Sequence, residues 1–310
     1  MGQLLPQIIP VILLLIMGKI INMREWFSRS TMGDLKRFTV NATLPAVLFL
    51  SFFNMELQNE YYLIFILTFV MLYLFFFTGK LLNRIPVIAH PILPYMTSGM
   101  AFGFIGIPFF LAVYGIEELG SYAIWGVGHE VFLWMFLFPW IRLHAGGKKF
   151  NRCELGAIVT SPTIMSIVAG ILLNRLGLPR ITEHNILLQS ILNTLNYLAA
   201  LTTPLILIIV GYDISVKRHL LKDCLKIITV RMAIMMSIGY AFKVLVINQL
   251  IPPEPIFNHA FFTFLILPPP LVVPMYISYL NDQKLVEIAS STIALSTILS
   301  VLLYSIVVLV

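Results

Sequence analysis

A histidine and a glutamate inside an apolar stretch are the first residues whose types could do chemistry. Of the 14 acidic residues, Glu130 alone is expected near the middle of an apolar run, and His129 precedes it. Burying a carboxylate in hydrocarbon costs on the order of 2.5 kcal/mol or more, so such a residue usually faces a cavity and often has a role. Two interpretations stay open. The pair binds and releases a coupling proton, or it is a neutral, hydrogen-bonded pair that holds its helix to neighbouring helices.

Two runs rich in proline and glycine are the second group of candidates. Gly103-Phe104-Ile105-Gly106-Ile107-Pro108 has two glycines before a proline, and Leu267–Pro274 has prolines at 268, 269, 270 and 274. Each proline lacks a backbone N–H and clashes with the preceding turn, so both runs are expected to interrupt a helix. In hydrocarbon, the freed backbone groups are tolerated only beside protein or a water-filled cavity. Pro108 and Pro274 suit the first residue of a new half-helix, and two such N-termini near the bilayer centre would suit an anion.

The composition indicates that these residues are positioned by membrane helices. The 310 residues are 59% hydrophobic and 11% charged, whereas soluble domains are about 45–50% apolar and roughly 25% charged. Two cysteines, Cys153 and Cys224, are too few for a disulfide scaffold or a thiolate metal cluster. The 20 basic residues are scattered singly, which argues against a nucleic-acid interface. We therefore expect a membrane protein with free thiols, no cofactor, no metal and no nucleic-acid partner.

Ten stretches are long and apolar enough for a spanning helix, which needs about 20 residues. They lie at 4–22, 37–53, 60–82, 92–114, 121–141, 154–174, 190–211, 224–247, 258–280 and 287–309. When each Lys or Arg is grouped with its nearer helix end, loops 1-2, 3-4, 5-6, 7-8 and 9-10 collect all but Arg175, Arg180 and Lys243. Lys and Arg accumulate on the cytoplasmic side. Both termini are therefore expected to be extracytoplasmic, in a multi-pass protein of the plasma membrane.

Ten spans divide into two inverted repeats of five, 1–153 and 154–310, because an odd number per half reverses the direction of the second half. Thr43-Leu44-Pro45 in span 2 has a counterpart in Thr202-Thr203-Pro204 of span 7. The Pro108 run of span 4 has a counterpart in the Pro274 run of span 9. The predicted fold is an all-α membrane protein of ten helices in which spans 4 and 9 are broken and cross.

The segments Thr43–Phe49, Gly103–Pro108, Thr203–Gly211 and Pro268-Pro269 resemble those of the auxin efflux carrier family, in the bile/arsenite/riboflavin transporter superfamily. The resemblance implies a scaffold of spans 1, 2, 6 and 7 and a transport unit of spans 3–5 and 8–10. It also implies elevator-type movement of organic anions. Two departures stand out. Ala101 occupies a position that is commonly asparagine, and Leu271-Val272-Val273 stands where a second asparagine often follows the span 9 prolines. Auxin itself is not an expected cargo.

The predicted function is secondary transport of a small organic anion, with the proton as one coupling ion. The alternatives are sodium-coupled symport of an organic anion and, less favoured, a channel. An enzyme is not expected, because the sequence has no HExxH, Walker A loop or acidic pair inside a predicted span. No arginine or lysine is expected inside the membrane as a counter-ion, which favours a small, weakly charged anion. Membrane lipid and a second copy in a homodimer are the other partners considered.

The predicted substrate-binding residues surround the two breaks or face them from spans 2 and 7. They are Ala101, Gly103, Gly106, Pro108, Pro268, Pro269, Pro270, Val273, Pro274, Asn41, Thr43 and Thr203, with Glu130 and His129 assigned to proton coupling.

Overall fold

The computed structural model describes residues 5–55, 61–144, 160–179, 185–252 and 254–309. Cys153, Arg180 and the repeat boundary at 153/154 lie outside these ranges, as do the first residues predicted for span 6. Cys224 is a buried free thiol.

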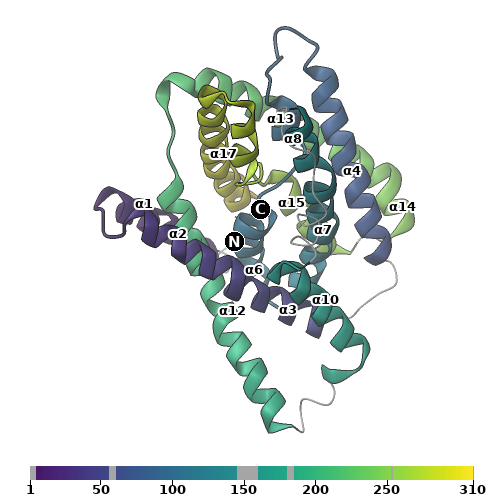
Figure 1. Cartoon of the computed structure of the whole chain (residues 1–310). Helices are drawn as coiled ribbons and strands as arrows, with labels where there is room; N and C mark the ends of the chain where they lie inside the picture. The colour runs from purple at the N-terminus through teal and green to yellow at the C-terminus, as the bar shows by residue number, and fades with distance from the viewer. Residues whose placement is uncertain (1–4, 56–60, 145–159, 180–184, 253, 310) are drawn as a thin grey trace. The chain divides into compact units, whose positions relative to one another are not determined.

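Every regular element within the described ranges is helical (Figure 1). The α-helices are α1 (Leu5–Met23), α2 (Arg29–Phe38), α3 (Leu44–Asn54), α4 (Tyr61–Leu82), α5 (Leu93–Met96), α6 (Ile107–Tyr114), α7 (Leu119–Phe132), α8 (Phe138–His144), α10 (Pro162–Arg175), α12 (Ile186–Asp213), α13 (Leu221–Phe242), α14 (Asn248–Leu250), α15 (Pro255–Ile266), α16 (Val273–Ile277) and α17 (Gln283–Leu309). Four wider π-helical turns, η1 (Thr39–Thr43), η2 (Phe102–Gly106), η3 (Leu133–Leu137) and η5 (Lys243–Ile247), and two 3-10 turns, η4 (Arg218–Leu220) and η6 (Ser278–Leu280), continue or join them.

Five helical stretches of the described chain are long and apolar enough to cross a membrane. They are Leu63–Leu82, Leu119–Ile141, Ile186–Asp213, Arg218–Leu250 and Gln283–Ile306. Shorter apolar helices occur at Ile9–Met23, Phe102–Tyr114, Pro162–Arg175 and Pro255–Ile266. The chain therefore has the helical, apolar character of a membrane protein. The count of ten spans, the inverted repeats and the extracytoplasmic termini stay predictions.

The helices group into two compact units. Unit 1 consists of Met1–Gln58, Gly103–Ala123 and Asn151–Asp213, and unit 2 of Asn59–Phe102, Ile124–Phe150 and Ile214–Val310. The chain passes from unit 2 to unit 1 between Phe102 and Gly103, inside predicted span 4.

In unit 1, α1 packs closely against α12 (Figure 1). Gly18 makes the close approach possible, because a Cβ there would collide with Ile208 O and lie 2.8 Å from Tyr212 N. Four residues later, Asn22 Nδ2 donates to Tyr212 O over 2.6 Å, near the C-terminus of α12. A small residue thus brings the two backbones together, and an amide satisfies a carbonyl that its own helix leaves without a partner.

The pair formed by α10 and α3 repeats this arrangement. A Cβ on Gly170 would lie 2.8 Å from Phe49 O. Four residues later, Asn174 Nδ2 approaches Phe52 O at 3.2 Å, Phe53 O at 2.7 Å and Met55 O at 2.8 Å, at the C-terminus of α3. Glycine and asparagine at a spacing of four therefore perform the same two tasks in both helix pairs.

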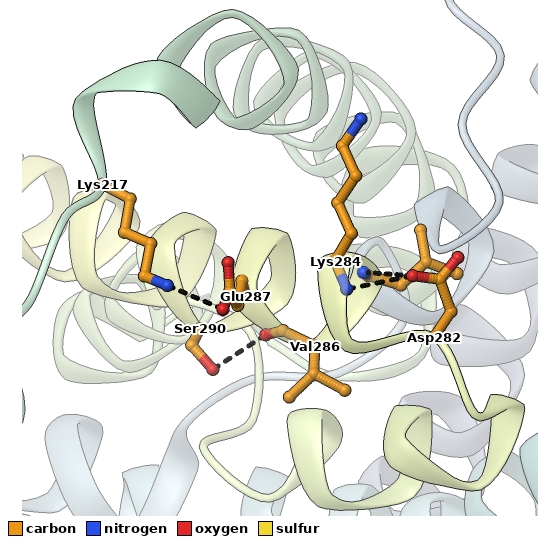
Figure 2. Close-up of polar contacts among 7 residues, drawn as sticks. Lys217, Asp282, Lys284, Val286, Glu287 and Ser290 are labelled. Carbon is orange, nitrogen blue, oxygen red and sulfur yellow. Dashed lines mark hydrogen bonds and ion pairs between the residues drawn. The ribbon is translucent and has the colours of Figure 1, made fainter.

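In unit 2, the start of α17 is tied to the segment before α13 (Figure 2). Asp282 Oδ1 accepts from the backbone N–H groups of Lys284 at 3.0 Å and Leu285 at 3.2 Å, which satisfies two of the first donors of α17. Lys217 Nζ lies 2.7 Å from Glu287 Oε1 (Figure 2). The first turns of α13 and α17 consequently lie together.

Candidate functional site

Both proline-rich segments interrupt their helices. In the first, α5 ends at Met96, residues 97–101 are not helical, and the chain resumes as η2 and α6. In the second, α15 ends at Ile266 and α16 begins at Val273. The first break lies before Gly103–Pro108 rather than within it. Pro108 stands in the first turn of α6, where a missing N–H costs least, and the preceding η2 winds more widely than an α-helix.

The two breaks touch each other inside unit 2. The Ala101 N–H donates to Pro268 O over 2.8 Å, so one non-helical segment satisfies a backbone group of the other. A Cβ on Gly99 would lie 2.7 Å from Pro270 Cγ and 2.8 Å from Leu133 Cδ2, so a larger residue would force these two side chains to move. We call residues 97–101 together with 267–272 the crossing. Ala101, Pro268, Pro269 and Pro270 are all buried there, Val273 is buried just beyond it, and Pro274 is partly buried.

An arginine binds both sides of the crossing. Arg231 of α13 is 1% exposed. Its Nη1 donates to Met96 O, the last residue of α5, and its Nη2 donates to Leu267 O over 2.9 Å. A buried cation therefore lies beside the crossing, contrary to the expectation that no arginine or lysine is available there as a counter-ion. The grouping of each Lys and Arg with its nearer helix end assigned Arg231 to the cytoplasmic side. Its side chain is instead buried, at 1% exposure.

Lysine 243 is a second cation enclosed in the apolar stretch of the same helix. Its side chain is 9% exposed, and its Nζ lies 3.0 Å from Asn248 Oδ1. It stands in η5, twelve residues beyond Arg231. Only Arg231 of the two is bonded to the crossing.

His129 is attached to the crossing as well. Its side chain is 1% exposed, and the Met100 N–H donates to its Nε2 over 2.9 Å. An accepting Nε2 carries no proton, so a neutral His129 holds its proton on Nδ1. That Nδ1 lies 3.4 Å from Glu130 Oε1 and makes no hydrogen bond. Protonation of the ring at Nε2 would therefore break the bond to the backbone of the crossing.

Glu130 is more accessible than His129. Its side chain is 25% exposed, and its Oε2 accepts from Trp134 Nε1–H over 2.9 Å, one turn along the same helical stretch. The partner of Glu130 is thus on its own helix, whereas that of His129 is in the non-helical segment of the crossing. Both interpretations of the pair stay open on this geometry.

The other predicted site residues belong to unit 1. Thr43 is buried in η1, and its Oγ1 donates to Thr39 O over 3.3 Å, whereas Asn41 in the same turn is exposed. Thr203 is partly buried in α12, which runs through Pro204 without a break. Gly103 lies in η2, where a Cβ would be 3.4 Å from Leu44 Cδ2. Gly106 and Pro108 are buried at the junction of η2 and α6.

His90, in the segment between α4 and α5, is a buried group outside the apolar helices. Burial lowers the pKa of His90, and Lys226 and Lys284 lower it further, while Asp223 acts in the opposite direction. Lys226 Nζ also donates to Ala89 O over 2.7 Å, so α13 is tied to this segment.

No protein-family model matches the sequence, and no curated protein matches it. The resemblance to the auxin efflux carrier family therefore stays an expectation from a few motifs.

Proposed function

We propose that the protein is a secondary transporter that carries a small organic anion across the plasma membrane by elevator-type alternating access. The observation that carries the proposal is the crossing, where two interrupted apolar helices exchange a backbone hydrogen bond and share a buried arginine. Interrupted helices at membrane depth are tolerated where protein buries them or where they line a cavity, and they form the substrate sites of many carriers.

Ten spans in two inverted repeats are part of this proposal. The two similar helix pairs of unit 1 support it, since Pro10, Gly18 and Asn22 correspond to Pro162, Gly170 and Asn174 at one constant spacing. Under that symmetry, the pairing of span 1 with span 7 corresponds to the pairing of span 6 with span 2. Each asparagine then caps the second helix of the other repeat.

Contacts between helix ends support the proposed topology. Lys217 lies in loop 7-8 and Glu287 at the first residue of span 10, both assigned to the cytoplasmic side, and they form an ion pair. Lys226, near the start of span 8, donates to the carbonyl of Ala89 in loop 3-4, and both are assigned to that same side. A helix end on the wrong side of the bilayer could not make these contacts. Together with the positive-inside rule, these contacts support the proposed extracytoplasmic position of both termini.

A fixed scaffold and a moving unit are the second part of the proposal. Predicted spans 1, 2, 6 and 7 and the second part of span 4 lie in unit 1. Spans 3, 8, 9 and 10, the first part of span 4 and span 5 from Ile124 onward lie in unit 2. This grouping supports a mechanism in which unit 2 carries the cargo and unit 1 stays in place. The chain between Phe102 and Gly103 would be one of the connections that bend.

An anion is favoured over a neutral cargo because of Arg231. A buried cation without a carboxylate partner is costly, and among the described residues its partners are backbone carbonyls. An anionic cargo would supply the missing charge. Glu130, with His129, remains the proposed route for a coupling proton, and sodium coupling is the alternative.

Uptake into proteoliposomes tests the proposal. Purified protein is reconstituted, and labelled propionate, lactate, malonate and succinate are offered under an imposed proton gradient, an imposed sodium gradient or none. We expect saturable, protein-dependent uptake of at least one carboxylate. Absence of uptake for every carboxylate under every gradient would contradict the proposal. Uptake that stays linear with concentration would favour a channel.

A further inference from the structure

Arg231 has donors that nothing in its surroundings uses. A guanidinium offers five N–H groups, and the hydrogen bonds of Arg231 are made by its two Nη atoms. Its Nε is buried and has no hydrogen-bond partner. Within the described ranges, no carboxylate pairs with this side chain. The arrangement holds the guanidinium in a fixed orientation and leaves its Nε–H without a partner.

Two serines of α17 lie near the second break, and one of them, Ser296, also has a hydroxyl without a hydrogen-bond partner. Ser300 Oγ donates to Ile266 O over 2.5 Å, at the residue before the Leu267 carbonyl that Arg231 binds. Ser296 lies one turn earlier on the same face of α17 and is 5% exposed. Unlike Ser300, its hydroxyl has no hydrogen-bond partner.

The helix contacts bring Arg231 and Ser296 to the same level. Near the start of both helices, Cys224 Sγ donates to Ile288 O over 3.8 Å. Arg231 is seven residues after Cys224, about two turns, so the two share a face of α13, and Ser296 is eight residues after Ile288.

The same alignment holds further along the two helices. A Cβ on Gly239 of α13 would meet Leu265, and Ser300 of α17 bonds to the adjacent Ile266. The two helices therefore run in the same direction, and the rise per residue from these contacts puts Arg231 and Ser296 at similar heights along them.

We propose that Arg231 Nε and Ser296 Oγ bind the charged end of the cargo, and that this cargo carries a single carboxylate. The assignment rests on the proposed transport function and adds the substrate class. The Nε–H and the neighbouring Nη–H of a guanidinium form a fork that fits two carboxylate oxygens, and a hydroxyl can donate to one of them. One guanidinium at the crossing compensates one negative charge. A second carboxylate would be buried there without a counter-ion, which is costly.

The closing experiment compares four variants in which one group is removed at a time. Arg231→Gln removes the charge and the fork, and Lys243→Gln removes the other buried cation of the same stretch. Ser296→Ala removes the unpartnered hydroxyl, and Ser290→Ala removes an exposed hydroxyl of α17 that bonds to Val286 O (Figure 2). The probes are labelled propionate, propionamide as its neutral counterpart, and succinate. Binding to detergent-solubilised protein and uptake into proteoliposomes are both measured, and gel-filtration profiles establish that each variant is folded.

We expect the wild type to bind propionate at least about tenfold more tightly than propionamide or succinate. Propionamide lacks the charge that the guanidinium compensates, and succinate brings a second charge without a counter-ion. Arg231→Gln should weaken propionate binding about 10- to 100-fold and remove the preference over propionamide. Ser296→Ala should weaken it about two- to tenfold, with the fold intact. Lys243→Gln and Ser290→Ala should bind as the wild type does.

The outcomes separate this assignment from the proposed function. Unchanged propionate affinity in Ser296→Ala and in a folded Arg231→Gln would overturn the assignment, while carboxylate uptake by the wild type would still support transport. Tighter binding of succinate than of propionate would overturn the single-charge claim. If Arg231→Gln does not fold, the assignment is tested by the propionate affinity of Ser296→Ala and by the preference of the wild type for propionate over propionamide. Absence of carboxylate uptake by the wild type would overturn the proposed function and the assignment together.

Discussion

Replacing Asn174 with alanine should destabilise the protein more than replacing Asn22, although the two asparagines occupy similar positions. Asn174 Nδ2 lies within 3.2 Å of three carbonyls at the end of α3, whereas Asn22 Nδ2 donates to one carbonyl of α12. An amide has two N–H hydrogens, so Asn174 makes two full bonds at most. Hydrogen bonds between membrane helices average about 0.6 kcal/mol and reach about 1.7 kcal/mol. Asn174→Ala should therefore cost about 1–3 kcal/mol and Asn22→Ala about half as much.

The free energy of unfolding can be measured by titrating SDS into protein held in dodecylmaltoside micelles, with tryptophan fluorescence as the signal. Asn193→Ala is the matched control, because Asn193 is exposed on α12 of the same unit. We expect the control to unfold like the wild type. Equal losses for Asn174→Ala and Asn22→Ala, or a loss for Asn174→Ala no larger than that of the control, would refute the reasoning from bond number.

Three further predictions concern packing, coupling and pH. Gly18→Ala should destabilise the α1–α12 pair by about 1–3 kcal/mol because the new Cβ meets backbone atoms of α12. Gly33→Ala has no atom within 4 Å of the new Cβ and should stabilise α2 by about 0.5–1 kcal/mol. The same SDS titration measures both variants, and equal effects would contradict the close packing at Gly18. Glu130→Gln should abolish the dependence of uptake on a proton gradient while leaving folding intact, and unchanged coupling would dismiss the proton role. Because burial lowers the pKa of His90 below its unfolded value of 6.5, the unfolded state binds more protons, so the free energy of unfolding should fall as the pH drops below about 6.5. His90→Asn should flatten that pH dependence, and an equally steep slope in the variant would show that another group is responsible.

The class of the protein and the interruption near Pro268 could be predicted because each follows from local chemistry. Composition alone identifies apolar helices, and three consecutive prolines cannot continue a helix. The first break was placed too late in the chain, at Gly103–Pro108 rather than at residues 97–101. A glycine before a proline permits a wide helical turn as readily as a break. What opens the chain earlier is the close approach of Gly99 to Pro270 and the bond from Ala101 to Pro268, which are tertiary contacts.

The role of Arg231 could not be predicted from its position in the chain. A basic residue in the outer third of an apolar run is typical of a side chain that reaches the membrane surface. Arg231 instead turns inward, because the ends of α5 and α15 offer carbonyls that their own helices leave unsatisfied. These two carbonyls lie within reach of one side chain only when the fold brings the two distant segments together. By contrast, the match between Pro10, Gly18 and Asn22 and Pro162, Gly170 and Asn174 was readable in the sequence. Its residues occupy similar places in two helix pairs, whereas the proline step of span 7 does not break its helix at Pro204.

Counterflow in proteoliposomes tests the central claim, that the crossing serves a carrier of organic anions, most directly. Vesicles are loaded with unlabelled propionate and diluted into a trace of labelled propionate with no ion gradient. A carrier that alternates between two faces will accumulate label transiently above its external concentration, and the accumulation will disappear in Arg231→Gln while persisting in Lys243→Gln. Label that only equilibrates, or accumulation that is the same in all three proteins, would contradict the account.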